Sequence, residues 1–168
     1  MRRFWIQQVL PILLCLVPVL AAGLVVVALP PLALQFYLEQ VRRSPIDWLI
    51  LGLGLALFVV QLGLSQRALQ WTGTGFDERP DRWLSHLAQA AEWFPLLGLL
   101  GTVAGILQTF GSITGPITPQ EVIAKYSPAI TATGSGLLMA LLNILPTWLV
   151  LIGRDVIRPL GGDTEGRR

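Results

Sequence analysis

The chain has 168 residues, of which 53% are hydrophobic and 13% charged, with a formal net charge of +2; soluble domains carry about twice that charged fraction. This composition argues against a soluble globular domain, and the small net charge gives no reason to expect nucleic acid as a partner. Four uncharged runs are each long enough for a membrane helix of about 20 residues. They extend from Phe4 to Leu38, Trp48 to Gln66, Trp93 to Gln120 and Tyr126 to Gly153. We expect an all-α integral membrane protein with four transmembrane helices.

The first helix is expected from about Phe4 to Leu29, with Pro30 and Pro31 ending it because proline lacks a backbone donor. Two arginines followed by an apolar stretch and an alanine pair resemble a signal peptide, whose cleavage would leave three spans. The long apolar stretch favours a retained helix. An outer loop would follow, carrying Glu39, Arg42, Arg43 and Asp47.

The second helix is expected from about Pro45 to Leu69. Glycines, charges and a proline then predict a short cytoplasmic connection over residues 70–90. Helical spacing resumes at Pro80, so the third helix is expected to begin in the cytoplasm and to end near Phe110. The organisation would be residues 1–69 as peripheral helices, 70–90 as the connection, 91–158 as channel helices and 159–168 as a cytoplasmic tail.

A helix start is predicted at Thr118, where Thr118-Pro119-Gln120-Glu121 fits a capping box. We expect a short helix of about two turns there, and then the fourth membrane helix from about Pro128 to Val156.

Basic residues indicate the orientation of the chain. With the N-terminus inside, nine of the twelve lysines and arginines fall in cytoplasmic segments and three in outer loops, as the positive-inside rule requires. Both termini are therefore predicted to be cytoplasmic.

The sequence offers little for enzyme chemistry. The single cysteine, Cys15, lies in an apolar run, and the single histidine, His86, lies on a polar helical stretch. We find no catalytic motif and no metal-ligand or cofactor pattern, so we expect no enzyme activity, metal or cofactor.

The third and fourth membrane helices carry small and polar residues along one face each. On the third, Gly98, Thr102, Gly105 and Thr109 share a stripe; on the fourth, Ala132, Gly136, Ala140 and Asn143 share a face, flanked by Thr131 and Ser135. Small residues allow close helix packing, which we expect at Gly98, Gly101, Gly105, Gly136 and Ala140. The polar residues could equally line a conduit, and composition does not separate these two interpretations.

The third helix resembles the MotA/TolQ/ExbB proton channel family. It reproduces the P-x-x-G-L-x-G-T-V-x-G-I pattern of the ExbB/TolQ branch from Pro95 to Ile106, and Pro128 and Pro146 match two prolines of the next family helix. The resemblance covers about residues 90 to 153. It implies the channel-forming subunit of an ion-driven motor in the bacterial inner membrane, which energises transport or envelope work.

The resemblance also implies partners and pore residues. Five copies would surround a single-span partner resembling ExbD, TolR or MotB, which supplies an intramembrane aspartate. The resemblance places only Thr102 of the family motif in the pore, and the interpretation of the two faces as a conduit adds Thr109, Thr131, Ser135 and Asn143 as pore-lining residues.

Two departures from the ExbB/TolQ pattern support an alternative. Ala132 stands where that branch usually has glutamate, and Leu137 where it usually has threonine. No acid or base lies deep within an expected span, so this subunit alone would lack a titratable site. The alternative is a non-conducting scaffold that clasps a partner helix.

Overall fold

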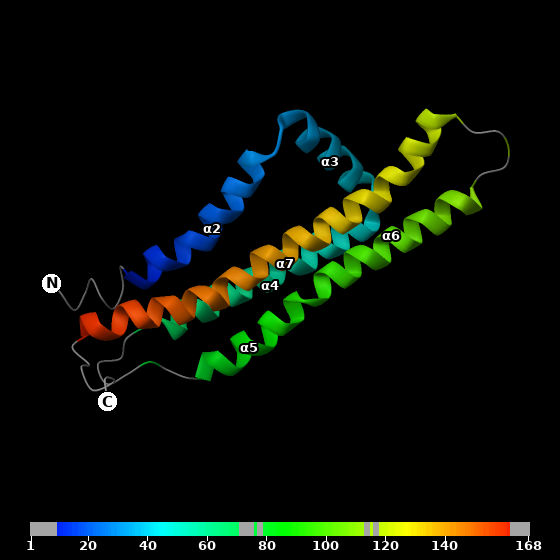
Figure 1. Cartoon of the computed structure of the whole chain (residues 1–168). Helices are drawn as coiled ribbons and strands as arrows, with labels where there is room; N and C mark the ends of the chain where they lie inside the picture. The colour runs from blue at the N-terminus through cyan, green and yellow to red at the C-terminus, as the bar shows by residue number, and fades with distance from the viewer. Residues whose placement is uncertain (1–9, 71–75, 77–78, 113–114, 116–117, 162–168) are drawn as a thin grey trace. The chain divides into compact units, whose positions relative to one another are not determined.

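A computed structural model describes residues 10–70, 76, 79–112, 115 and 118–161. Within them the chain forms helices (Figure 1) whose bounds are α2 Leu10–Ala28, α3 Pro31–Arg43, α4 Pro45–Ala68, α5 Arg79–Ala91, α6 Trp93–Gly111 and α7 Pro119–Gly161. Three helical stretches among the described residues are long and apolar enough to cross a membrane, or four if the bent pair α2–α3 forms one span. The expected all-α multi-pass membrane architecture is confirmed.

The segment after the first helix is helical, so the expected outer loop between Pro31 and Arg43 is wrong. Pro30 and Pro31 do end α2, but Pro31 also occupies the first position of α3, where a missing N–H costs nothing. Arg42 and Arg43 lie in the last turn of α3, where cations favour the helix dipole. The two helices are bent by 106° at this break.

Helices α4, α5 and α6 follow the expected limits closely. Helix α4 ends at Ala68, one residue before the expected end, and α6 ends at Gly111, one residue beyond it. Glu92 separates α5 from α6 but keeps right-handed helical dihedral angles. The two therefore read as a single candidate span, Arg79–Gly111.

Helix α7 is one helix of 43 residues, which Figure 1 shows as an unbroken ribbon. Its capping box is confirmed: the Thr118 N–H donates to Glu121 Oε2 at 2.9 Å, and the Glu121 N–H to Thr118 Oγ1 at 3.4 Å. The expected break at Pro128 is wrong. Membrane helices tolerate an interior proline, and α7 continues through Pro128 without a break.

The contacts between helices fall into two compact units. The first comprises residues 1–25, 57–89 and 142–168; the second comprises residues 26–56 and 90–141. The core of the first contains apolar side chains from α2, α4, α5 and α7, among them Cys15, Ala68, Leu84 and Leu149.

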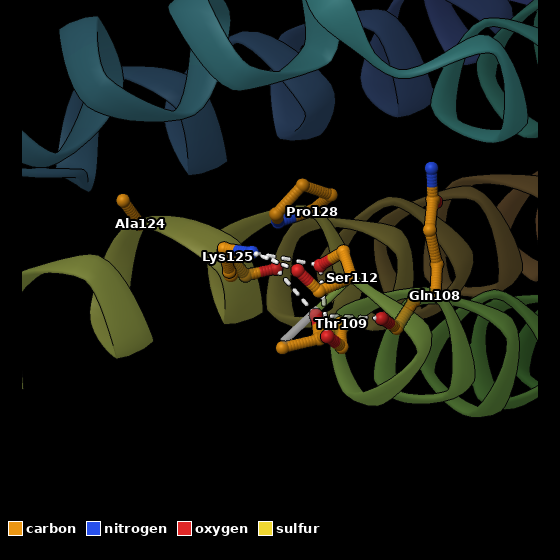
Figure 2. Close-up of a pocket in the computed structure, with 7 residues that line it drawn as sticks. Gln108, Thr109, Ser112, Ala124, Lys125 and Pro128 are labelled. Carbon is orange, nitrogen blue, oxygen red and sulfur yellow. Dashed lines mark hydrogen bonds between the residues drawn. The ribbon is translucent and has the colours of Figure 1, made fainter. Parts of the chain in front are cut away.

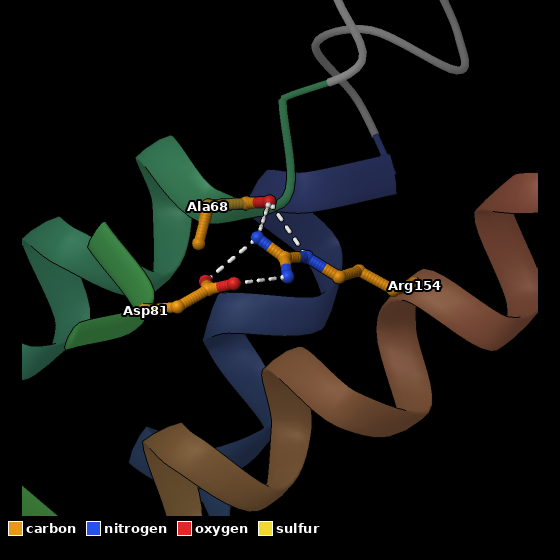
Figure 3. A network of polar contacts seen from close by, with 3 residues as sticks. All are labelled: Ala68, Asp81 and Arg154. Carbon is orange, nitrogen blue, oxygen red and sulfur yellow. Dashed lines mark hydrogen bonds and ion pairs between the residues drawn. The ribbon is translucent and has the colours of Figure 1, made fainter. Parts of the chain in front are cut away.

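Arg154, Asp81 and Ala68 form a network of polar contacts within this first unit (Figure 3). Both terminal nitrogens of Arg154 contact the Asp81 carboxylate, at 2.6 and 2.8 Å. Its Nε and Nη2 also donate to Ala68 O, each at 3.2 Å. Ala68 is the last residue of α4, so its carbonyl has no partner within the helix. Arg154 of α7 therefore joins the end of α4 to the start of α5.

The outer surface of the described helices carries many large apolar side chains, such as Leu24, Leu107 and Ile130, each more than 60% exposed. A lipid environment, or further copies of the chain, would cover such side chains at little cost.

Candidate functional site

Helices α6 and α7 approach each other at the level of their backbones. A Cβ added to Gly98 would lie 2.9 Å from Ala132 O, and one added to Gly105 would lie 2.9 Å from the Ala129 Cβ. A Cβ on Gly101 would lie 2.7 Å from the Ala132 Cβ, and one on Gly136 would meet Phe94 O. Gly98, Gly101, Gly105 and Gly136 thus lie at one contact, which we call the glycine seam. Ala140, the fifth expected packing residue, is buried on α7.

Thr102 lies in the glycine seam, midway along α6. Its Oγ1 lies 3.0 Å from Ala129 O and 3.1 Å from Gly98 O. It also forms a hydrogen bond with Thr133 Oγ1 of α7. Both threonines keep partial exposure at the edge of the seam. Sequence reasoning did not select Thr133, although it lies among the hydroxyl residues of the same helix.

The other four expected pore residues are covered by the subunit's own helices. Thr109 is 3% exposed and Thr131 5%, while Ser135 and Asn143 are fully buried. Thr109 Oγ1 lies 2.8 Å from Gly105 O, so its hydroxyl is engaged with the backbone. Thr102 is therefore the one expected pore hydroxyl that a single described subunit leaves partly accessible.

Thr131 and Ser135 turn toward an acid that the sequence did not indicate as buried. Asp47 lies in the first turn of α4 and is fully buried, which corrects its expected place in an outer loop. Thr131 Oγ1 donates to Asp47 Oδ2 at 3.0 Å, and Ser135 Oγ donates to Asp47 Oδ1 at 2.5 Å. Ser135 Oγ also lies 2.6 Å from the Tyr37 hydroxyl of α3.

A cavity of about 210 Å³ opens near the far end of the seam, where α6 ends (Figure 2). Lys125 reaches across it, and its Nζ donates to Ser112 Oγ at 2.8 Å and to Ser112 O at 3.1 Å. Cations favour the C-terminal end of a helix, so this lysine stabilises the end of α6. Gln108 also lines the cavity and is exposed.

A model of the MotA/TolQ/ExbB proton channel family matches residues 50–153, more than half of the chain. The chain belongs to this family. The family consists of channel subunits of membrane motors, and the match does not distinguish the ExbB/TolQ branch from the others. No curated protein and no solved structure matches the chain.

The family match covers the glycine seam and Thr102 but only part of the buried acid's surroundings. Thr131 and Ser135 lie inside the matched range, whereas Tyr37 and Asp47 precede it. The Asp47 network is thus a feature of this chain that the family assignment does not explain.

Proposed function

We propose that the protein is the channel-forming subunit of a proton-driven motor in the bacterial inner membrane. Copies of it, five by family resemblance, would surround a single-span partner of the ExbD, TolR or MotB type. Both termini would be cytoplasmic, and the ion flow would energise transport or envelope work. Family membership supports the channel role, and the Pro95 to Ile106 pattern favours the ExbB/TolQ branch.

The observation that carries the proposal is the hydroxyl pair of Thr102 and Thr133 at the exposed edge of the glycine seam. The surrounding exposed side chains of both helices are apolar, among them Val103, Ile130 and Leu137. Two hydroxyls at the edge of such a surface offer hydrogen bonds to pore water or to a partner carboxylate, and an apolar surface offers none. Thr109, Thr131, Ser135 and Asn143 would contribute to the pore only if assembly exposes them.

The partner is needed because a hydroxyl cannot hold the charge of a transported proton. In the proposed motor, the partner's intramembrane aspartate gains and loses the proton, and Thr102 stabilises each form by a hydrogen bond. Position 132 leaves no room for a carboxylate from this chain, because the Ala132 Cβ already packs against Gly101.

Proton flux into vesicles tests this proposal, with the subunit co-reconstituted with its single-span partner. Thr102→Val keeps the shape and removes the hydroxyl, so we expect it to abolish partner-dependent flux while the oligomer still assembles. Ser85→Ala is the matched control, because Ser85 is an exposed hydroxyl on α5; it should leave flux unchanged. Full flux through Thr102→Val would contradict the proposed role of this residue.

A scaffold that clasps a partner helix without conducting is the second candidate. Ala132, 1% exposed in the glycine seam where the ExbB/TolQ branch usually has glutamate, favours it. Partner binding without proton flux, under any gradient, would support the scaffold and contradict the channel.

A further inference from the structure

Asp47 is a carboxylate buried on a membrane-spanning helix without a cationic partner. It is fully buried, and no described residue forms an ion pair with it. Ionisable groups inside membrane spans are costly and are retained mostly where function uses them.

We propose that Asp47 is a proton-exchanging site, reached through a chain of hydroxyls that runs from Tyr37 through Ser135. The site is distinct from the proposed pore at Thr102. It uses Asp47 and Tyr37, which lie outside the family-matched residues. The proposal does not depend on a partner protein or on conduction.

Asp47 Oδ1 is the inner end of the hydroxyl chain. In the ionised form, Ser135 donates to Oδ1 and Tyr37 donates to Ser135. All three groups are linked by distances of 2.5 and 2.6 Å. Because a hydroxyl both donates and accepts, the same chain can run in the opposite direction. A protonated Oδ1 would then donate to Ser135, and Ser135 to Tyr37.

When a proton is taken up along these hydroxyls, Asp47 is the group that gains one. Tyr37 and Ser135 each release one proton for every proton that they receive. A proton from water binds Tyr37 oxygen, and the original Tyr37 proton passes to Ser135 oxygen. The original Ser135 proton passes to Asp47 Oδ1. Tyr37 and Ser135 end as neutral hydroxyls, and Asp47 ends as a neutral carboxylic acid. Tyr37 is only partly covered, which gives the chain its outer end.

Asp47 Oδ2 has a separate hydroxyl partner, Thr131. Thr131 Oγ1 lies 3.0 Å from Oδ2 and 3.1 Å from Pro128 O, yet its hydroxyl has a single hydrogen. When Asp47 is ionised, that hydrogen points to Oδ2. When Oδ2 is protonated, Thr131 accepts from it and turns its own hydrogen to Pro128 O. Both protonation states are therefore satisfied without any backbone movement.

The other charged groups near this site do not compensate Asp47. On α3, Arg42 is exposed, and Glu39 and Arg43 pair with each other at the surface. Helix α6 contains no acid or base between Trp93 and Gly111. On the α7 segment of this unit, Glu121 and Lys125 lie before Pro128, and Lys125 is bound to Ser112. Of these titratable groups, Tyr37 is the one that is linked to Asp47 by hydrogen bonds, through Ser135.

Infrared difference spectroscopy of the full-length chain in lipid bilayers tests the proposal, since it reports protonated carboxyl groups directly. We expect a carboxyl band that grows as the pH falls and is lost in Asp47→Asn. The amide in that variant can accept from Ser135 and donate to Thr131, as the acid protonated on Oδ2 does, so the variant should fold. Glu39→Gln, an exposed acid on α3, is the control and should retain the band.

Two further variants test the proposed hydrogen bonds to Asp47 and the route of the proton through the hydroxyls. Tyr37→Phe should keep the band but slow its appearance after a pH jump by at least about tenfold, since a positioned proton donor is lost. Thr131→Val should shift the band frequency, because Oδ2 loses its hydrogen bond. If wild type and Asp47→Asn give the same carboxyl spectrum at every pH, the proposal is wrong. An unchanged protonation rate in Tyr37→Phe would overturn the proposed route. Should Asp47→Asn fail to fold, the Tyr37 and Thr131 variants decide the matter by the same readouts.

Discussion

Arg154 and Asp81 meet through both guanidinium terminal nitrogens and both carboxylate oxygens, at 2.6 and 2.8 Å, although 73 residues separate them in the chain. This two-point geometry is the strongest form of ion pair between these side chains. We expect Asp81→Asn to lower the free energy of unfolding by about 1 kcal/mol, a modest value because Asp81 is partly exposed to solvent. Thermal unfolding in lipid or mild detergent measures it.

The surface pair of Arg43 and Glu39 is the control: Arg43→Gln should change stability by less than about 0.5 kcal/mol. Equal effects of the two substitutions would contradict the interpretation.

The glycine seam predicts that a single methyl group is enough to disturb the packing of α6 on α7. In Gly98→Ala the new Cβ would meet backbone atoms of Ala132 and Thr133, which cannot move aside as a flexible side chain can. We expect a loss of about 1–3 kcal/mol in stability. Gly52→Ala on α4 is the matched control, because nothing lies within 4 Å of its new Cβ. It should be neutral or stabilising, and a similar loss in both variants would count against the seam.

The capping box predicts a local effect at the start of α7. Thr118→Ala removes the oxygen that accepts from the Glu121 N–H, at a typical cost of about 1 kcal/mol. Hydrogen exchange of the amides in the first turn of α7 should speed up, while exchange in α4 should not change. Gln120→Ala, exposed in the same turn, should leave all of these rates as they are.

The proposed orientation can be checked by cysteine labelling. The buried Cys15 is first replaced by alanine so that it does not react. Gly75→Cys should then be labelled from the cytoplasmic side and Gly115→Cys from the outer side, because the basic residues favour cytoplasmic termini. Labelling of Gly115→Cys from the cytoplasm alone would reverse the orientation.

The long apolar helices were predictable because their signals are local. The limits of α4 and α6 follow from uncharged runs bounded by prolines and charges, and the capping box follows from four adjacent residues. Helix α3 was missed because Pro30 and Pro31 end one helix and start another, and a charged amphipathic segment resembles a loop. The helix break predicted at Pro128 was wrong because proline ends helices less readily in membranes than in water.

The buried acid could not be predicted, because its burial depends on distant residues. Asp47 stands among charged residues in the sequence, and its hydrogen-bond partners on α7 lie 84 and 88 residues away. The faces of α6 and α7 were predictable as small and polar. The sequence could not predict which helix each of these hydroxyls contacts. Thr131 and Ser135 lie on the same helix as Thr133, but they bind Asp47 of α4, whereas Thr133 binds Thr102 of α6.

The length of α7 has a consequence for the surroundings of the protein. At about 1.5 Å per residue, its 43 residues span roughly 65 Å, whereas a bilayer with its headgroups is about 40–45 Å thick. Helix α7 is thus longer than a bilayer is thick, even when the headgroups are included. If α7 crosses the bilayer near its normal, part of the helix extends beyond the headgroups, where a component in water can contact it.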